Sequence, residues 1–141
     1  MALVYFDSSA LVKLLVDEAG TDLVVALWDA CDAALSSRLA HPEVTAALAA
    51  AGRNHDIADL PAMRRAWKGF WSAIRPVELT EGVEQHAARL AAEHHLRGAD
   101  AVHLASALAV GDPNLVMAVW DRRLHAGALA VGLATAPATV T

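Results

Sequence analysis

Short, wholly apolar segments alternate with longer helical segments along this chain, and this alternation constrains the fold more than any other feature. Residues 2–6 (ALVYF) predict a buried strand, because the run is apolar throughout and stops at Asp-Ser-Ser. Residues 114–120 (NLVMAVW) have the same character and stop at Asp121. Strands that are apolar along their whole length are typical of parallel sheets covered on both faces. We therefore expect an α/β domain with a central parallel sheet.

The segments between and after these strands predict the other elements. Helices are expected over residues 9–16, 21–31, 41–54, 59–74, 81–95, 99–110 and 122–130, with strand-like segments at 33–36, at 75–80 and near 131–133. We expect residues 134–141 to form a loose tail. The length of 141 residues predicts a single domain, 1–141, that can bury a core without disulfides.

Composition limits where in the cell the protein is expected and which kinds of binding site it can form. No apolar run approaches the roughly 18 uncharged residues of a membrane span, and the first residues do not resemble a signal peptide. These observations predict a cytoplasmic protein without a membrane partner. The single cysteine, Cys31, excludes an internal disulfide and a multi-cysteine zinc site. The formal net charge of −5 disfavours a nucleic-acid partner, although residues 53–75 hold a local excess of Lys and Arg.

Four acidic residues stand where strands end or helices begin. Asp7 and Asp121 each end an apolar strand-like segment, whereas Glu43 and Asp100 lie in the first turns of predicted helices. Each has a purely structural interpretation, because Asp is a good helix N-cap and acids in a first turn interact favourably with the helix dipole. Taken one at a time, these residues need no functional explanation.

The repetition of this pattern at four positions favours a function beyond capping. In addition, Asp7 is not needed as a cap, because Ser8 or Ser9 could cap the first helix in its place. In parallel α/β sheets, ligands bind outside the carboxyl ends of the strands, where the strand order reverses, so the four acids can converge there. Two carboxylates about 4 Å apart repel by roughly 4 kcal/mol at an effective dielectric constant of about 20. A divalent cation offsets that repulsion, and oxygen donors without a Cys/His set indicate Mg²⁺ or Mn²⁺. Such a metal suits the hydrolysis of a phosphodiester.

The segment RGADAVHLASAL predicts an apolar helix with a single polar row. Asp100, His103 and Ser106 are spaced three residues apart on a helix that must be mostly buried. Buried polar groups need partners, so the row faces either a polar network or a functional site. His103 by itself is more typical of a hydrogen-bonded core histidine than of a ligand.

The sequence resembles the PIN-domain ribonucleases, especially the VapC-like toxins of type II toxin–antitoxin systems, over essentially the whole chain. The resemblance rests on VYFDSSALVKLL, HPEVTAAL, RGADAVHLASAL and VWDRRL, which follow one another in this order. The third segment is the most specific, and DSSALVK comes next. The resemblance implies a PIN-like three-layer α/β/α fold, with a central parallel sheet of four to five strands and about seven helices.

The same resemblance implies an activity and its site. It implies a Mg²⁺- or Mn²⁺-dependent endoribonuclease that acts as a toxin, with Asp7 and Asp100 as metal ligands. Glu43 and Asp121 would contribute directly or through water. The residues implied to support the site are Ser9 and His103. The implied partners are an RNA substrate, a small antitoxin protein and a second copy of the chain, in a homodimer and in toxin–antitoxin hetero-oligomers.

The basic side chains have two interpretations. They either contact RNA phosphates or form an ordinary solvated surface. If the helix expected over residues 59–74 continues by one residue, three of them share one of its sides, and two more follow Asp121. These candidates are Arg64, Lys68, Arg75, Arg122 and Arg123.

Other functional classes fit less well. An aspartyl-nucleophile phosphatase needs a second Asp two residues after the first, where this chain has Ser9. A receiver domain needs an adjacent acidic pair near the first strand end, and a nucleotide-binding fold needs a Gly-rich loop there. In this chain the first strand is followed by Asp7, Ser8 and Ser9, which provide neither. A PIN-like module that only binds RNA or protein is the non-enzymatic alternative.

Overall fold

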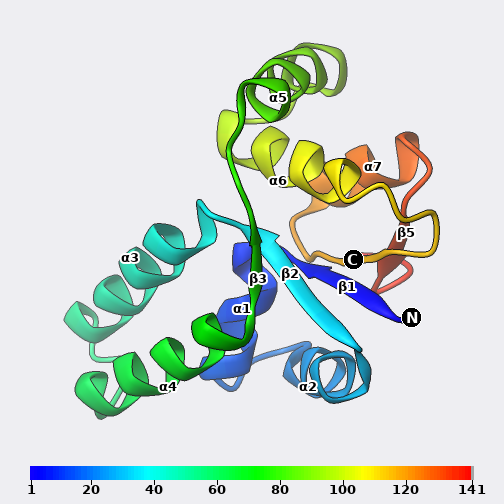
Figure 1. Cartoon of the computed structure of the whole chain (residues 1–141). Coiled ribbons are helices and arrows are strands. Elements are labelled where there is room, and N and C mark those ends of the chain that lie inside the picture. Colours follow the sequence, from blue (N-terminus) through cyan, green and yellow to red (C-terminus); the bar gives the residue numbers. More distant parts are fainter. Residues whose placement is uncertain (141) are drawn as a thin grey trace.

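Five parallel strands form one central sheet, and their order explains where the helices lie (Figure 1). The computed structural model describes residues 1–140. Over these residues the elements are β1 (Leu3–Phe6), α1 (Ser8–Leu15), α2 (Thr21–Ala30), β2 (Ala33–Ser37), α3 (Ala40–Arg53), α4 (Leu60–Ala73), β3 (Arg75–Val77), α5 (Glu81–His94), α6 (Gly98–Ala109), β4 (Val116–Ala118), α7 (Arg122–Ala130) and β5 (Ala134–Ala136). The predicted α/β class, strand number and helix number are confirmed for the described part of the chain.

The sheet has the strand order β3-β2-β1-β4-β5. The chain therefore moves outward from β1 through β2 to β3, and then returns past β1 to add β4 and β5. Crossovers between parallel strands are right-handed almost without exception, so this reversal sends the later helices to the other face. Helices α1 to α4 cover one face and α5 to α7 cover the other (Figure 1).

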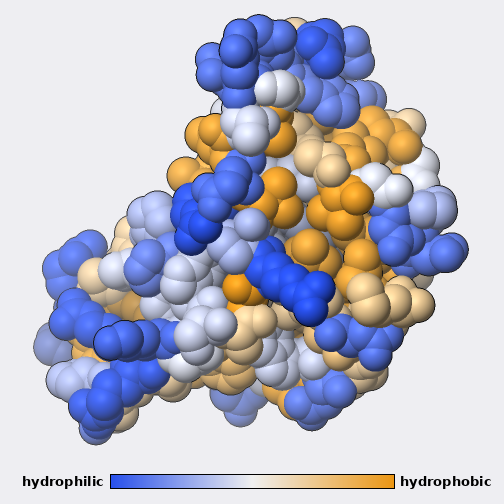
Figure 2. Space-filling model, viewed as in Figure 1, coloured by the Kyte–Doolittle hydropathy of each residue, from blue (hydrophilic) through white to orange (hydrophobic). Residues whose placement is uncertain are grey.

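Each face of the sheet has its own apolar core. Successive side chains of β1 point to opposite faces. Tyr5 therefore packs with Leu104 of α6 and Met117 of β4, whereas Phe6 packs with Leu11 of α1 on the other face. Hydrophilic side chains cover the outside of α5, and hydrophobic ones gather over α6 (Figure 2). Within residues 1–140, no helix is both long and apolar enough to cross a membrane.

The C-terminal strand lies later than expected. Residues 131–133 follow α7 and contain a turn, in which Gly132 has a φ of +86°. The strand is β5, which pairs with β4 through Val116 opposite Ala134. The prediction of a loose tail from residue 134 is therefore wrong over β5. β5 is a three-residue edge strand whose side chains are exposed or half-buried, so it lacks the buried apolar run by which the sequence reveals β1 and β4.

The basic side chains predicted to share one helical face over residues 64–75 lie on two different elements. Arg64 and Lys68 are exposed on α4, but Arg75 is the first residue of β3. Arg75 precedes Pro76, and the residue before a proline is disfavoured in a helical conformation. Ile74 is already extended, with φ −84° and ψ 140°, so the helix ends before it. Arg75 therefore does not share a helical face with the other two.

Candidate active site

The candidate site lies at the carboxyl end of the central strands, where the strand order reverses. Asp7 directly follows β1, and its N–H donates to the carbonyl of Ala118, the last residue of β4, at 3.2 Å. Asp121 follows β4 after two further residues and is the N-cap of α7. The reversal between β1 and β4 is the position at which open α/β sheets bind their ligands.

Asp7 is a buried carboxyl group with several donors. Its side chain is the N-cap of α1 and accepts a hydrogen bond from the Ala10 N–H at 2.9 Å. The Ser9 hydroxyl donates to both of its oxygens, at 2.8 and 2.9 Å. The pKa of Asp7 is raised from 3.8 to about 6, chiefly by burial and to a smaller extent by the charge of Asp121, against the opposing effect of His103. A fully ionised Asp7 is therefore unfavourable without a nearby cation.

Glu43 lies in the first turn of α3 and has two donors from other elements. The Ser8 hydroxyl donates to Glu43 Oε1 at 2.7 Å, and His103 Nε2 lies 2.7 Å from the same oxygen. Partial burial acts to raise the pKa of Glu43, but the hydrogen bonds from His103 and Ser8 outweigh it and lower the pKa. The suggestion that Ser8 caps α1 is wrong, because Asp7 makes that cap and Ser8 reaches across to α3.

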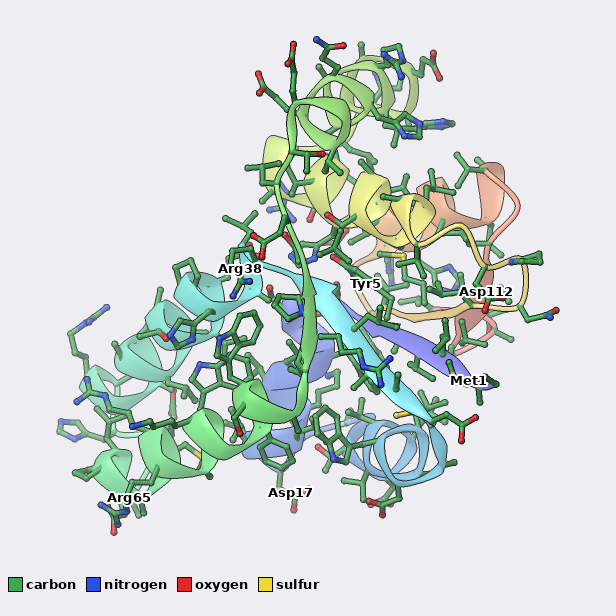
Figure 3. The ribbon with its side chains drawn as sticks, viewed as in Figure 1. Met1, Tyr5, Asp17, Arg38, Arg65 and Asp112 are labelled. Atoms are coloured by element: carbon green, nitrogen blue, oxygen red, sulfur yellow. The ribbon has the colours of Figure 1, made fainter. Side chains whose placement is uncertain are left out.

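His103 connects the site to the core. Its Nδ1 lies 2.8 Å from the hydroxyl of Tyr5, whose side chain points from β1 toward α6 (Figure 3). Burial raises the pKa of Tyr5 well above its ordinary value, so the phenol keeps its proton and can donate it to Nδ1. Nε2 then carries the ring proton and donates it to Glu43. Of the polar row on α6, His103 thus belongs to a hydrogen-bond network that ends at an acid of the site, whereas the buried Ser106 hydroxyl has no hydrogen-bond partner among residues 1–140.

Asp100 and Asp121 are bridged by an arginine that sequence reasoning missed. Arg97 Nε lies 3.0 Å from Asp100 Oδ2, and one of its terminal nitrogens lies 3.1 Å from Asp121 Oδ2. The other oxygen of Asp121 accepts the N–H of Leu124, so this residue is a cap as well. The spacing of three residues between Arg97 and Asp100 on one helical turn is the signal that would have identified the pair.

The four acids are therefore linked, but they do not form a coordination shell. His103 contacts Glu43 and also lowers the pKa of Asp7. Arg97 bridges Asp100 and Asp121, and the charge of Asp121 raises the pKa of Asp7. Within residues 1–140, no group of three or more His, Cys, Asp or Glu side chains is arranged to hold a metal ion.

The candidate RNA contacts lie on the surface. All five are exposed, with two on α4, one at the start of β3 and two at the start of α7 directly after Asp121; they are Arg64, Lys68, Arg75, Arg122 and Arg123. The last two are thus next to an acid of the site along the chain.

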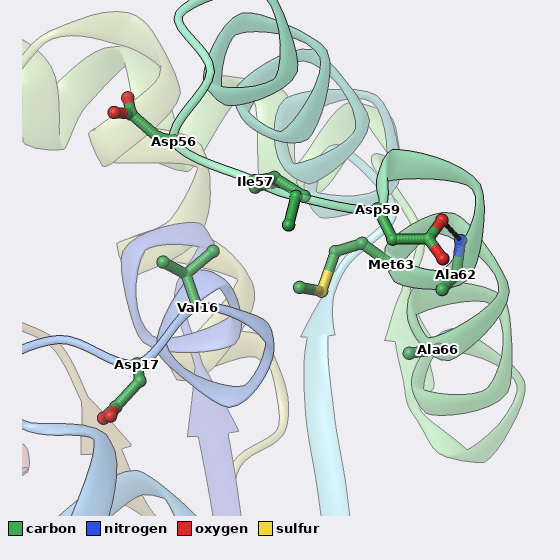
Figure 4. A pocket seen from close by; sticks show the side chains of 9 residues that line it. Val16, Asp17, Asp56, Ile57, Asp59, Ala62, Met63 and Ala66 are labelled. Carbon is green, nitrogen blue, oxygen red and sulfur yellow. Dashed lines mark hydrogen bonds between the residues drawn. The ribbon is translucent and has the colours of Figure 1, made fainter.

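A separate pocket of about 520 Å³ lies between the end of α1 and the start of α4 (Figure 4). Val16 and Asp17 line one side of it, and Ile57 and Met63 line the other. None of the four acids lines this pocket. It is therefore distinct from the candidate site.

Known proteins are similar to this chain over nearly its whole length. Two curated relatives, named Ribonuclease VapC45 and Ribonuclease VapC49 and each from a different strain of Mycobacterium tuberculosis, are both 69% identical to it over 140 residues. Each alignment covers 98% of this chain and 97% of the relative.

Solved structures share the fold. The crystal structure of PAE2754 from Pyrobaculum aerophilum superposes with a TM-score of 0.67 at 26% identity, covering 95% of this chain and 90% of that one. A toxin–antitoxin complex from Klebsiella pneumoniae contains a chain with a TM-score of 0.61 at 20% identity, covering 100% and 97%. The family model described as "PIN domain" matches residues 4–125. This chain therefore belongs to the PIN-domain family and, within it, to the VapC-like ribonucleases.

Proposed function

We propose that this protein is an endoribonuclease toxin that hydrolyses RNA phosphodiester bonds with a divalent cation, Mg²⁺ or Mn²⁺. The ligands are Asp7 and Asp100, and Glu43 and Asp121 contribute directly or through water. The observation that carries the proposal is the linkage of these four acids at the carboxyl ends of β1 and β4, in a chain whose 69% identical relatives are named ribonucleases.

The chemistry of the donor set supports a cation at this position. Asp7 is desolvated, with a pKa raised to about 6, so its ionised form gains from a nearby positive charge. Asp100 and Asp121 already share one cation, the guanidinium of Arg97. Carboxylate oxygens are the donors that Mg²⁺ and Mn²⁺ prefer. When bound, the cation would activate water and stabilise the charge that develops on the phosphate.

The residues of the chain itself orient the acids. The Ser9 hydroxyl and the Ala10 N–H fix both oxygens of Asp7. Ser8 and His103 hold Glu43 in its ionised form, so Glu43 can accept a hydrogen bond from an attacking water and orient it. Tyr5 in turn fixes the ring of His103.

The remaining elements of the proposal concern partners. The exposed basic side chains of α4, β3 and α7 contact RNA phosphates, which predicts cleavage that weakens as salt concentration rises. A small antitoxin neutralises the enzyme, two copies of the chain form a homodimer, and the protein acts in the cytoplasm, as the family resemblance implies.

A cleavage assay with matched variants tests the activity. The purified chain is incubated with end-labelled RNA and Mg²⁺ or Mn²⁺, with and without EDTA. We expect cleavage that EDTA abolishes and that Asp100→Asn removes, with unchanged far-UV circular dichroism. Asp22→Asn is the control, because Asp22 is an exposed acid in the first turn of α2. RNA that stays bound but uncleaved in every condition would instead indicate the non-catalytic module.

A growth assay tests the toxin role separately. Expression of the wild-type chain should arrest bacterial growth, and co-expression of the small protein encoded beside it should relieve the arrest. Normal growth on expression of a chain that cleaves RNA in vitro would contradict the toxin role while leaving the nuclease assignment intact.

A further inference from the structure

Arg97 is a surface residue placed between two acids of the candidate site. Its side chain is 67% exposed, whereas those of Asp100 and Asp121 are 14% and 30% exposed. It immediately precedes α6, at the N-cap position, but makes no side-chain hydrogen bond to the helix backbone. Its contacts with the two carboxylates are therefore not part of the capping of α6.

The guanidinium of Arg97 engages one oxygen of each of the two carboxylates. Asp100 Oδ2 and Asp121 Oδ2 both accept from it, and Asp121 Oδ1 already accepts from the Leu124 backbone. A divalent cation placed among these acids would also meet the positive charge of the guanidinium at close range. Arg97 and the metal therefore compete for the same two carboxylates.

We propose that Arg97 is a displaceable internal cation that bridges Asp100 and Asp121 in the metal-free protein and leaves them when a divalent metal binds. This inference rests on the proposed function, because it assumes that the two carboxylates face the metal. It fits the absence of a ready coordination shell among residues 1–140, since two of the four acids are bridged by an arginine.

The exchange is physically easy. Exposed ion pairs contribute little net free energy, so a divalent cation can replace this one. An exposed side chain changes rotamer on the picosecond to nanosecond scale, and Arg97 can move outward without unpacking either core. The apparent metal affinity is then the intrinsic affinity multiplied by the fraction of molecules in which the bridge is open.

The displacement can be observed directly by NMR in metal-free protein titrated with Mg²⁺. The Arg97 Nε–H signal, assigned by its absence in Arg97→Gln, should shift to the value of a solvated arginine at the same Mg²⁺ concentration that shifts the backbone amide of Asp100. If the Asp100 amide titrates while the Arg97 signal stays in place, the inference is overturned and the metal site stands. If neither signal moves, the proposed metal site itself is wrong, and the exchange with it.

Metal affinity provides the second test, measured as Mn²⁺ binding by electron paramagnetic resonance. If the bridge is closed in about nine molecules of ten, Arg97→Gln should bind Mn²⁺ about tenfold more tightly than the wild type. Arg53→Gln is the matched control, because Arg53 ends α3 ten residues after Glu43, about 15 Å along the helix, and should leave the affinity within about twofold. Unchanged or weaker Mn²⁺ binding by Arg97→Gln would refute the competition.

Discussion

Replacing Asp7 by asparagine is expected to stabilise the metal-free protein. The asparagine side chain keeps a carbonyl oxygen for the Ala10 N–H and is as good an N-cap as aspartate, so α1 retains its start. What the substitution removes is a carboxylate that is only 4% exposed and carries a raised pKa. The gain in stability should therefore follow the ionisation of Asp7.

The magnitude follows from the two pKa values. With a pKa of 3.8 in the unfolded chain and about 6 in the folded one, the folded state binds the proton of Asp7 more tightly. Well below pH 3.8 the Asp7 carboxyl is protonated in both the folded and the unfolded state, so its ionisation does not affect the free energy of unfolding. As the pH rises towards 6 the unfolded chain ionises first, so folding stability falls and then stays constant above about pH 6. The free energy of unfolding of Asp7→Asn should exceed that of the wild type by about 1 kcal/mol at pH 4.5 and about 3 kcal/mol at pH 8.

Urea denaturation followed by circular dichroism measures this difference. Both proteins are unfolded in EDTA at pH 4.5 and pH 8, and the slopes of the free energy against urea should agree. Asp22→Asn serves as a control, because Asp22 is exposed in the first turn of α2 and its substitution should give no gain that grows with pH. A gain of equal size at both pH values, or a variant less stable than the wild type at pH 8, would refute the reasoning.

Two further predictions concern the same network. Because a proton on Asp7 competes with the metal, single-turnover cleavage at a fixed, subsaturating concentration of free Mg²⁺ should fall at least tenfold per pH unit below about pH 6 and less steeply above it; a rate that stays constant from pH 8 to pH 5 would contradict Asp7 as a ligand. His103→Leu leaves the Tyr5 hydroxyl and Glu43 without a shared partner and should lower the free energy of unfolding by about 1–3 kcal/mol. Adding Tyr5→Phe should then cost less than in the wild-type background, and strictly additive effects in urea denaturation would argue against the network.

The order and type of most elements are predictable because their signals are local. Apolar runs that end at Asp7 and near Asp121 predicted β1 and β4, and helical periodicity with capping residues predicted all seven helices. The proline at position 76 also signals the end of α4, and the helix was predicted to stop at residue 74; only the predicted basic face was carried on to Arg75. β5 lacked such a signal, since its place depends on the backbone edge of β4.

Within the candidate site, the sequence by itself determined which residues stand at strand ends and in first helical turns. Those positions depend on neighbours only a few residues away, and they single out Asp7, Glu43, Asp100 and Asp121 as candidates. Only the tertiary structure decided which side chains meet. Ser8 reaches Glu43 across 35 residues, and Tyr5 reaches His103 across 98. Arg97 joins Asp121 across 24 residues, although its contact with Asp100 is local. The physical reason is that the order of strands in the sheet brings distant segments together, and no local pattern in the chain encodes that order.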